Sequence, residues 1–250
     1  MKSKIILITG ATDGIGKATA IALAKKGHTI IVHGRSREKA ENVRKQIQTE
    51  TGNNQIEILI ADLLSLMDVR RAVAEFKEKH GRLDVLINNT IDTFFMSTYG
   101  LSTHPDSGKG IFEVNDAGTK GIVNKLTELL RKSLSPRIVN VIWTSSTRTG
   151  TNQSAQTFFH HRLPDLQPAI ELMRLQTAHV VNKPRKTNFK IDTIVTSITT
   201  GIDPHDHQVI QKVKNESIDI IKYALTGKKD LGSIAVSLDI GGEDSTCAAV

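Results

Sequence analysis

The feature that most constrains this chain is a glycine-rich stretch between a strand pattern and a helix pattern. Residues 4–9 (KIILIT) form an apolar, β-branched run typical of a buried strand. GATDGIGK follows directly, then residues 18–26 predict a helix and residues 29–32 a second buried strand. Strand, glycine turn, helix and strand in this order predict a mononucleotide-binding unit. Its glycines let the backbone approach a pyrophosphate, and its helix N-terminus offers N–H groups to the phosphates.

The loop residues expected to bind the phosphates are Gly10, Thr12, Asp13, Gly14, Ile15 and Gly16. The alternative is a glycine-rich turn without a ligand. We favour a ligand, because three glycines at this spacing weaken a turn unless something approaches it closely.

Strand and helix patterns alternate along the rest of the chain. Strands are expected at residues 55–60, 83–88, 137–142, 190–195 and 233–238, and helices at 37–51, 66–80, 110–134, 165–182 and 208–225. This alternation predicts a single α/β domain over residues 1–250, with a doubly wound, seven-stranded parallel sheet of the Rossmann type. Ligands of such sheets bind beyond the C-terminal strand ends.

Composition narrows the possible partners and the compartment. The net charge is +7, but the lysines are scattered along helices and aromatic residues make up 4% of the chain, so we expect solvated faces and no nucleic-acid partner. No apolar run reaches membrane-spanning length, and we expect no membrane partner. The single cysteine, Cys247, suits a reducing compartment, so we expect a cytoplasmic protein.

The stretch TGATDGIGK resembles the TGxxxGxG signature of the short-chain dehydrogenase/reductase family. The resemblance implies a nicotinamide cofactor and an oxidoreductase acting on a carbonyl or hydroxyl substrate. Family members that prefer NAD carry an acid after the second strand. Here Gly34, Arg35 and Ser36 stand there, which implies NADP(H), since a guanidinium and a hydroxyl suit a 2′-phosphate. Alternatively, Arg35 is a solvated turn residue.

Two further strand ends match the family's adenine and ribose positions. Asp62 corresponds to the aspartate that binds the adenine amino group, and the Leu63 N–H to the group that reads the ring. Asp62 alternatively caps a helix. Asn88 opens the family's Asn-Asn-Ala-Gly, but Thr90 and Ile91 replace the small pair, so the nicotinamide side of the pocket is altered.

The catalytic positions match the family only in part. Asn115 corresponds to the asparagine that holds a water in the proton relay, although a lone helical asparagine can simply face solvent. Ser145 and Ser146 are the candidates for the family's serine pair. They follow three inserted residues, Ile142-Trp143-Thr144, so either the strand is longer or an insertion displaces them.

The family's tyrosine, and the lysine four residues later, are missing where the resemblance places them, at residues 166–170. The only tyrosines are Tyr99 and Tyr223, and neither has a lysine four residues on. His160 and His161 are alternative proton donors. The His205-Asp206-His207 triplet is a poor metal site without further ligands, and we expect no metal.

Three functions stay open. The chain is a divergent NADP(H)-dependent oxidoreductase without the usual relay, or a nucleotide-sensing or partner-binding protein without turnover, or a non-redox enzyme such as a cyclase or dehydratase. The small-molecule substrate is unknown. The resemblance implies association through the long helix, so we expect a homodimer or homotetramer, although the apolar stripe of that helix could equally belong to the core.

Overall fold

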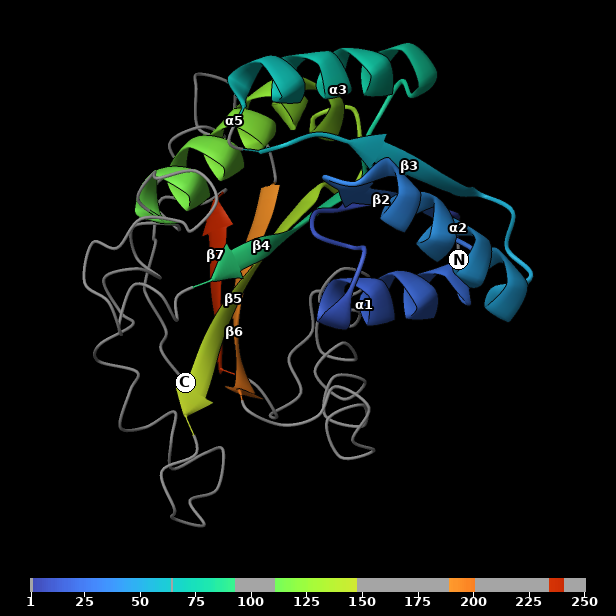
Figure 1. Cartoon of the computed structure of the whole chain (residues 1–250). Coiled ribbons are helices and arrows are strands. Elements are labelled where there is room, and N and C mark those ends of the chain that lie inside the picture. The colour runs from blue at the N-terminus through green and yellow to red at the C-terminus, as the bar shows by residue number, and fades with distance from the viewer. Residues whose placement is uncertain (1, 64, 93–110, 148–188, 201–233, 241–250) are drawn as a thin grey trace.

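The computed structural model describes residues 2–63, 65–92, 111–147, 189–200 and 234–240 (Figure 1). The described strands and helices follow one another in the alternating order that the sequence predicts. They are β1 (Ile5–Ile8), α1 (Gly14–Ala24), β2 (Thr29–Gly34), α2 (Arg37–Thr51), β3 (Ile56–Ile60), α3 (Leu66–Lys79), β4 (Val85–Asp92), α5 (Ile111–Leu130), β5 (Arg137–Thr147), β6 (Phe189–Thr200) and β7 (Ile234–Ile240).

The strands form one sheet in the order β3-β2-β1-β4-β5-β6-β7. Pairing is parallel from β3 through β6, and the strand order reverses between β1 and β4. This arrangement confirms the doubly wound α/β fold. The prediction of one domain over residues 1–250 stays a prediction, because it also covers ranges outside the described residues.

One strand departs from the expected parallel sheet. β7 pairs antiparallel with the first seven residues of β6, from Ile234 opposite Val195 to Ile240 opposite Phe189. The sequence prediction was wrong here because it assumed a crossover connection between β6 and β7, which would make β7 run in the same direction as β6. An antiparallel edge strand on an otherwise parallel sheet is common.

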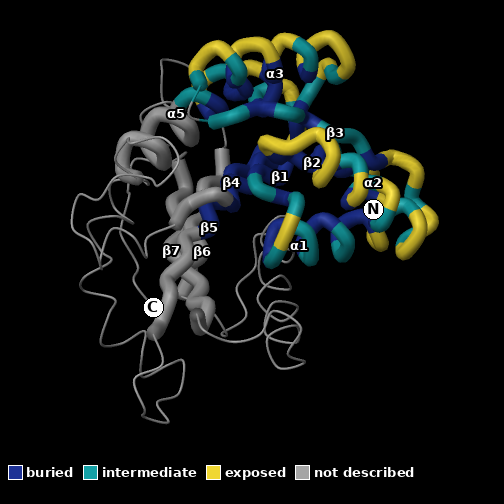
Figure 2. The backbone as a smooth tube through the Cα atoms, viewed as in Figure 1, coloured by how far each residue is buried: buried dark blue, intermediate teal, exposed yellow. Residues whose placement is uncertain are grey.

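Each face of the sheet packs against two of the described helices. Successive strand side chains point to opposite faces, so Ile6 and Ile8 join one apolar cluster and Leu7 joins the other. The first cluster contains residues of α1 and α2, and the second contains residues of α3 and α5 (Figure 1). Figure 2 shows the buried strands between the more exposed helices.

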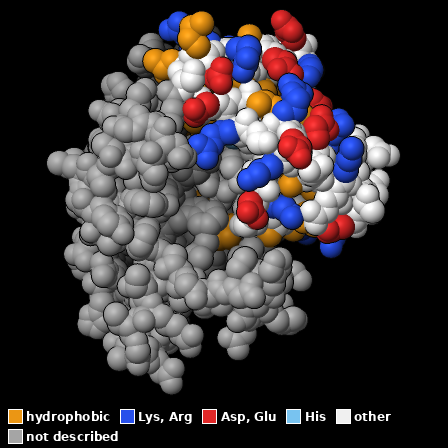
Figure 3. Space-filling model, in the orientation of Figure 1, with side chains coloured by type: hydrophobic (Ala, Val, Ile, Leu, Met, Phe, Trp, Pro, Cys, Tyr) orange, Lys and Arg blue, Asp and Glu red, His pale blue; other side chains and the backbone are white. Residues whose placement is uncertain are grey.

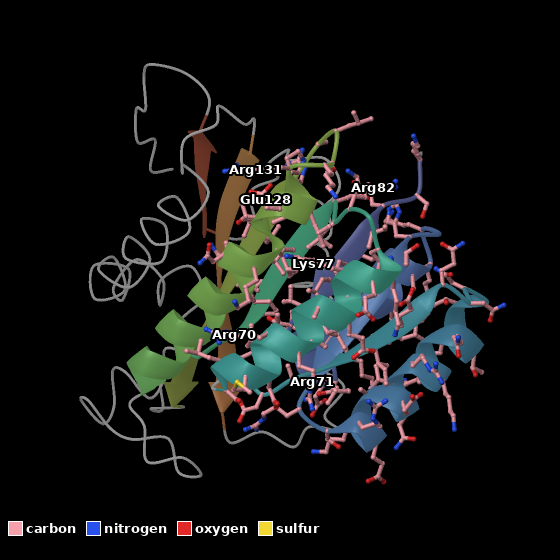
Figure 4. All side chains as sticks on the ribbon, turned by 90° about the horizontal axis from the view of Figure 1, so that it is seen from above. Arg70, Arg71, Lys77, Arg82, Glu128 and Arg131 are labelled. Carbon is pink, nitrogen blue, oxygen red and sulfur yellow. The ribbon has the colours of Figure 1, made fainter. Side chains whose placement is uncertain are left out.

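Charges of both signs cover the outer helices. Figure 3 shows Lys and Arg side chains interspersed with Asp and Glu on the described face. Many are paired within one helix turn: Arg44–Glu41 at 2.7 Å, Arg71–Asp68 at 3.1 Å, Lys79–Glu75 at 3.0 Å and Arg131–Glu128 at 3.6 Å. Figure 4 shows the helices α3 and α5 side by side, with Arg71, Glu128 and Arg131 labelled. Within the described ranges, no helix is both long and apolar enough to cross a membrane.

The central strands run further than the sequence predicts. The pairing of β4 with β5 shifts between Asn88 and Ile91, which marks a β-bulge, and it then continues to Asp92. β5 continues to Thr147, with Ser145 opposite Ile198 of β6. The alternative of a longer strand is therefore correct, and the alternative of an insertion that displaces the serines is wrong.

A buried carboxylate ties the N-terminal ends of the central strands together. Asp84 is 6% exposed, and its side chain accepts hydrogen bonds from Ile5 N at 2.9 Å, Ser133 Oγ at 2.6 Å and Arg82 Nε at 3.1 Å. Its carbonyl accepts from Arg137 N at 3.0 Å. Burial alone would raise the pKa of Asp84, but the bonds from Ser133, Ile5 and Arg82 outweigh it and lower the pKa.

We expect Asp84→Asn to lower the free energy of unfolding at pH 7 by about 1–3 kcal/mol, because a neutral amide replaces the buried acceptor of three donors. A lowered carboxyl pKa stabilises the fold above the ordinary value of 3.8, and this contribution is lost as the pH falls through the folded value. Urea unfolding should therefore show the difference at pH 7 and a smaller one at pH 3. Ser133→Ala, which removes one donor, should cost less. An equal difference at both pH values would contradict the role of the charge.

Candidate nucleotide-binding site

The glycine loop is held between the two strands that flank β1. Thr9 N donates to the Ile87 carbonyl of β4 at 2.9 Å, and Ala11 N donates to the His33 carbonyl of β2 at 2.9 Å. Between them, Gly10 N donates to Nδ1 of His33 at 3.3 Å. The loop is therefore anchored on both sides, at the point where the strand order reverses.

Two of the predicted glycines are required by their backbone conformation. Gly10 has a φ of 58° and Gly14 a φ of 52°, in the left-handed region that favours glycine. Gly10 turns the chain out of β1, and Gly14 turns it into α1. The helix begins at Gly14 instead of residue 18, so the end of the glycine motif is itself the first helical turn.

The N-terminus of α1 offers hydrogen-bond donors. Asp13 is the N-cap, and its exposed carboxylate accepts from Gly14 N at 2.7 Å. The Asp13 carbonyl accepts from Lys17 N at 3.1 Å, which is the first helical hydrogen bond. The N–H groups of Ile15 and Gly16 have no partner among the described residues. This is the arrangement in which a helix N-terminus binds a phosphate.

Glycine is required at position 16 because a side chain there would clash with neighbouring atoms. A Cβ there would lie 2.5 Å from Asn89 Nδ2 and 2.5 Å from the Gly10 carbonyl oxygen. That same pair forms a hydrogen bond, since Asn89 Nδ2 donates to the Gly10 carbonyl at 3.3 Å. Asn89 N also donates to Thr9 Oγ1 at 2.8 Å. Asn89 thus connects β4 to the glycine loop, and α1 packs directly on this contact.

We expect Gly16→Ala to lower the free energy of unfolding by about 1–3 kcal/mol and to weaken nucleotide binding, because backbone must move to admit the methyl group. Thermal unfolding and dinucleotide titration measure the two effects. Gly81→Ala is the matched control, since a Cβ at Gly81 would meet nothing within 4 Å. Equal behaviour of the two variants would disprove the close packing at Gly16.

His33 is a buried, neutral part of the loop anchor. The residue is 2% exposed, near the end of β2. Burial lowers the pKa of His33 to about 4, against smaller opposing effects of the Ala61 backbone and Asp62. The ring is therefore neutral near pH 7, and the bond from Gly10 N makes Nδ1 the acceptor and leaves the proton on Nε2. The sequence prediction missed His33, because only the folded chain brings it beside Gly10.

We expect stability to fall as the pH drops from about 6.5 toward 4, because the unfolded chain binds a proton at His33 before the folded chain does. The slope from this one group reaches about 1.4 kcal/mol per pH unit. His33→Asn keeps an acceptor that does not titrate, so urea unfolding should show a shallower acid slope. His28→Asn removes a buried histidine distant from the loop and should leave nucleotide binding unchanged. Identical acid slopes for wild type and His33→Asn would contradict the assignment.

The end of β2 carries the groups predicted to read the ribose. Gly34 is buried, whereas Arg35 and Ser36 are exposed. Ser36 is the N-cap of α2, and its hydroxyl accepts from Lys39 N at 3.3 Å. Arg35 makes no hydrogen bond or ion pair with any described residue.

Asp62 and Leu63 follow β3 at the same edge of the sheet. Both are half-buried, and Ala61 N donates to the Gly34 carbonyl at 3.3 Å, which holds the end of β3 against the end of β2. The N-cap of α3 is Ser65, whose side chain accepts from Asp68 N. The alternative role of Asp62 as a helix cap is therefore wrong, and its role toward adenine stays a prediction.

Asn88 contacts β5, whereas its neighbour Asn89 contacts the glycine loop. Asn88 is 1% exposed, and its Nδ2 donates to Asn140 Oδ1 of β5 at 2.8 Å. Asn88 thus joins β4 to β5 just before the bulge, while Asn89, which the sequence prediction did not select, contacts the glycine loop. Asn88 Oδ1 is buried and has no partner among the described residues.

The predicted catalytic residues are located by their backbone. Asn115 lies in α5, and Ser145 and Ser146 lie in β5. Their side chains lie outside the described residues, as do His160, His161, His205 and the segment 166–170, where the absence of the family's tyrosine and lysine stays a prediction. Their catalytic roles stay predictions. No cluster of potential metal ligands occurs in the part of the chain that the structure describes.

The family is established by comparison with known proteins. The family model of the short chain dehydrogenases matches residues 4–155, which include the glycine loop, all of β1 to β4, α5 and β5. The chain therefore belongs to the short-chain dehydrogenase/reductase family, whose members bind nicotinamide cofactors. The glycine loop, which carries the family's signature, lies where the strand order of the sheet reverses.

Several human proteins are similar to part of this chain. Retinol dehydrogenase 13 is 36% identical over 143 residues, which cover 55% of this chain and 40% of that protein. Human retinol dehydrogenase 11 is 37% identical over 56% of this chain and 43% of its own length, and human polyprenol dehydrogenase is 35% identical over 55% and 42%. The matches thus span about two fifths of the length of these relatives.

Solved structures share the fold. A β-ketoacyl-[ACP] reductase from Bacteroides thetaiotaomicron covers 79% of this chain and 77% of its own, with a TM-score of 0.53 and 22% identity. An alcohol dehydrogenase from the archaeon Thermococcus sibiricus, complexed with 5-hydroxy-NADP, covers 76% and 75% with a TM-score of 0.52 and 19% identity. At these identities the likeness concerns the fold.

Proposed function

We propose that this chain binds NADP(H) and is an oxidoreductase that acts on a carbonyl or hydroxyl substrate without the usual tyrosine and lysine. The observation that carries the proposal is the end of β2. Gly34 supplies no carboxylate to repel a 2′-phosphate, and the exposed Arg35 beside it is free of protein partners within the described residues.

The residues present fit a dinucleotide. Ile15 N and Gly16 N have no partner among the described residues and could donate to a pyrophosphate, and the close approach of α1 at Gly16 leaves no room for a side chain. Arg35 and Ser36 would hold a 2′-phosphate, and Asp62 with the Leu63 N–H would hold the adenine. The bound cofactor would supply the hydride. The chain's own residues bind and orient it, and Asn115, Ser145 and Ser146 are the candidates for holding water or polarising the substrate.

The names of the relatives suggest substrates to test first. Two are called retinol dehydrogenases and one a polyprenol dehydrogenase. We therefore take isoprenoid alcohols and aldehydes as the first substrate class. Loss of a positioned general acid typically costs about 10²–10⁴-fold in rate, so turnover is expected to be slow, with His160, His161, a serine or water as the proton source.

A second function is favoured by the course of β4. In the family, a small pair after the two asparagines lets the backbone lie against the cofactor. Here β4 passes through a bulge and Ile91 pairs with Ile142 of β5. A continued strand with a branched residue there favours a protein that binds the adenine half alone, as a nucleotide sensor, partner-binding protein or non-redox enzyme.

We expect NADPH to bind at least tenfold more tightly than NADH, and Arg35→Ala to remove most of this difference. Loss of one charge-assisted bond to a phosphate costs about 1.5–3 kcal/mol. Fluorescence titration of NADPH, NADH and adenosine 2′,5′-bisphosphate measures the affinities. Lys45→Ala, an exposed cation further along α2, is the matched control. Equal affinities of wild type for the two dinucleotides would refute NADP(H) selectivity.

The two functions differ in turnover. Steady oxidation of NADPH with retinal or a polyprenal, measured at 340 nm, supports the oxidoreductase function. A rate ~10³-fold below that of an enzyme with a positioned general acid would still count as support. Binding of the bisphosphate as tightly as NADPH, with no oxidation of NADPH, supports the adenine-half function instead.

We propose further that the protein is a cytoplasmic homodimer or homotetramer with neither nucleic acid nor membrane as a partner. The mixed charges on the described face support the absence of a nucleic-acid partner, because nucleic-acid surfaces concentrate one sign of charge (Figure 3). Sedimentation velocity of the whole chain tests the oligomeric state.

A further inference from the structure

Gly34 is a glycine for a steric reason that lies in the glycine loop. Its φ is outside the left-handed region, so its backbone would accept any residue. A Cβ at Gly34 would nevertheless lie 2.5 Å from Cγ2 of Thr12, whereas Oγ1 and Cβ of Thr12 would be 3.4 and 3.6 Å away. The latter two are ordinary contacts. A single methyl group therefore excludes a side chain at Gly34.

The backbone on both sides of this contact is anchored. The loop is held to β2 because Ala11 N donates to the His33 carbonyl at 2.9 Å and Gly10 N donates to His33 Nδ1 at 3.3 Å. The strand end is held to β3, since the Gly34 carbonyl accepts from Ala61 N at 3.3 Å. Thr12 is β-branched and half-buried, so its χ1 is restricted. Neither partner can move away easily.

We propose that Thr12 and Gly34 form a steric pair that selects the cofactor. In dinucleotide-binding folds an acid about 20 residues after the glycine loop binds the ribose hydroxyls of NAD. Gly34 stands at that position, and the Thr12 methyl group closes it to an aspartate. NADP(H) preference then depends on the loop as well as on Arg35. A change of preference toward NAD requires both members of the pair to change.

This inference rests on the proposed binding of NADP(H), and the test separates the two. Wild type, Gly34→Asp, Thr12→Ser and the double variant are titrated with NADPH and NADH. Thr12→Ser removes the methyl group and keeps the hydroxyl. Gly34→Asp alone should lose at least tenfold in NADPH affinity without binding NADH more tightly. The double variant should bind NADH at least tenfold more tightly than Gly34→Asp does.

A second set of variants tests the steric pair without a ligand. Gly34→Ala should lower the melting temperature by roughly 2–4 °C or more, and Thr12→Ser/Gly34→Ala should recover most of this loss. Gly81→Ala is the control, because a Cβ there meets nothing.

The possible results distinguish failure of the steric pair from failure of the proposed function. NADH binding by Gly34→Asp that equals that of the double variant would overturn the pair, and so would a Gly34→Ala melting temperature equal to that of the Gly81→Ala control. A wild type that binds neither dinucleotide would refute the proposed function and cofactor selection with it. Recovery of the melting temperature by Thr12→Ser would in that case still support the steric contact.

Discussion

The structure depends on backbone hydrogen bonds that join the C-terminal ends of β1, β2, β3 and β4. Thr9 N and Ala11 N bind the carbonyls of the strands on either side of β1, and Ala61 N binds the carbonyl of Gly34. Parallel strands place these ends on one edge of the sheet, where α1 begins. The donors at the N-terminus of α1 are therefore directed by the sheet, and the glycines permit the close contacts that this arrangement needs.

The sequence predicted well the elements that local chemistry determines. α2 was predicted over its full length, because Ser36 caps its start and Gly52, in the left-handed conformation, ends it. The glycine loop was predicted for a similar reason, since its residues carry their own conformational requirement. α1 was predicted to begin too late, because a glycine motif was interpreted as a loop when its second half is helical.

Contacts between distant residues were not predicted. His33 meets Gly10 across 23 positions and Asn89 meets Gly10 across 79, and no local pattern marks either partner. The length of β5 was underestimated because its serine- and threonine-rich end is a strand only through pairing with β6. The direction of β7 was wrong for a related reason, since strand direction depends on where the chain re-enters the sheet. The available signal for His33 was its position as a polar residue directly after the apolar run of residues 29–32.

Two titratable groups lie at opposite ends of the short central strands. Asp84 holds the N-terminal ends together, and His33 holds the glycine loop at the C-terminal ends. The pKa of His33 is about 4, and that of Asp84 lies below 3.8, but His33 begins to cost stability near pH 6.5 because the unfolded histidine takes up its proton there. In the folded chain the His33 ring stays neutral down to about pH 4, so mild acid lowers the free energy of unfolding while the contact between His33 and Gly10 persists. Burial also lowers the pKa of His28 at the opposite end of the strands, so both ends of the sheet contribute to the loss of stability in mild acid.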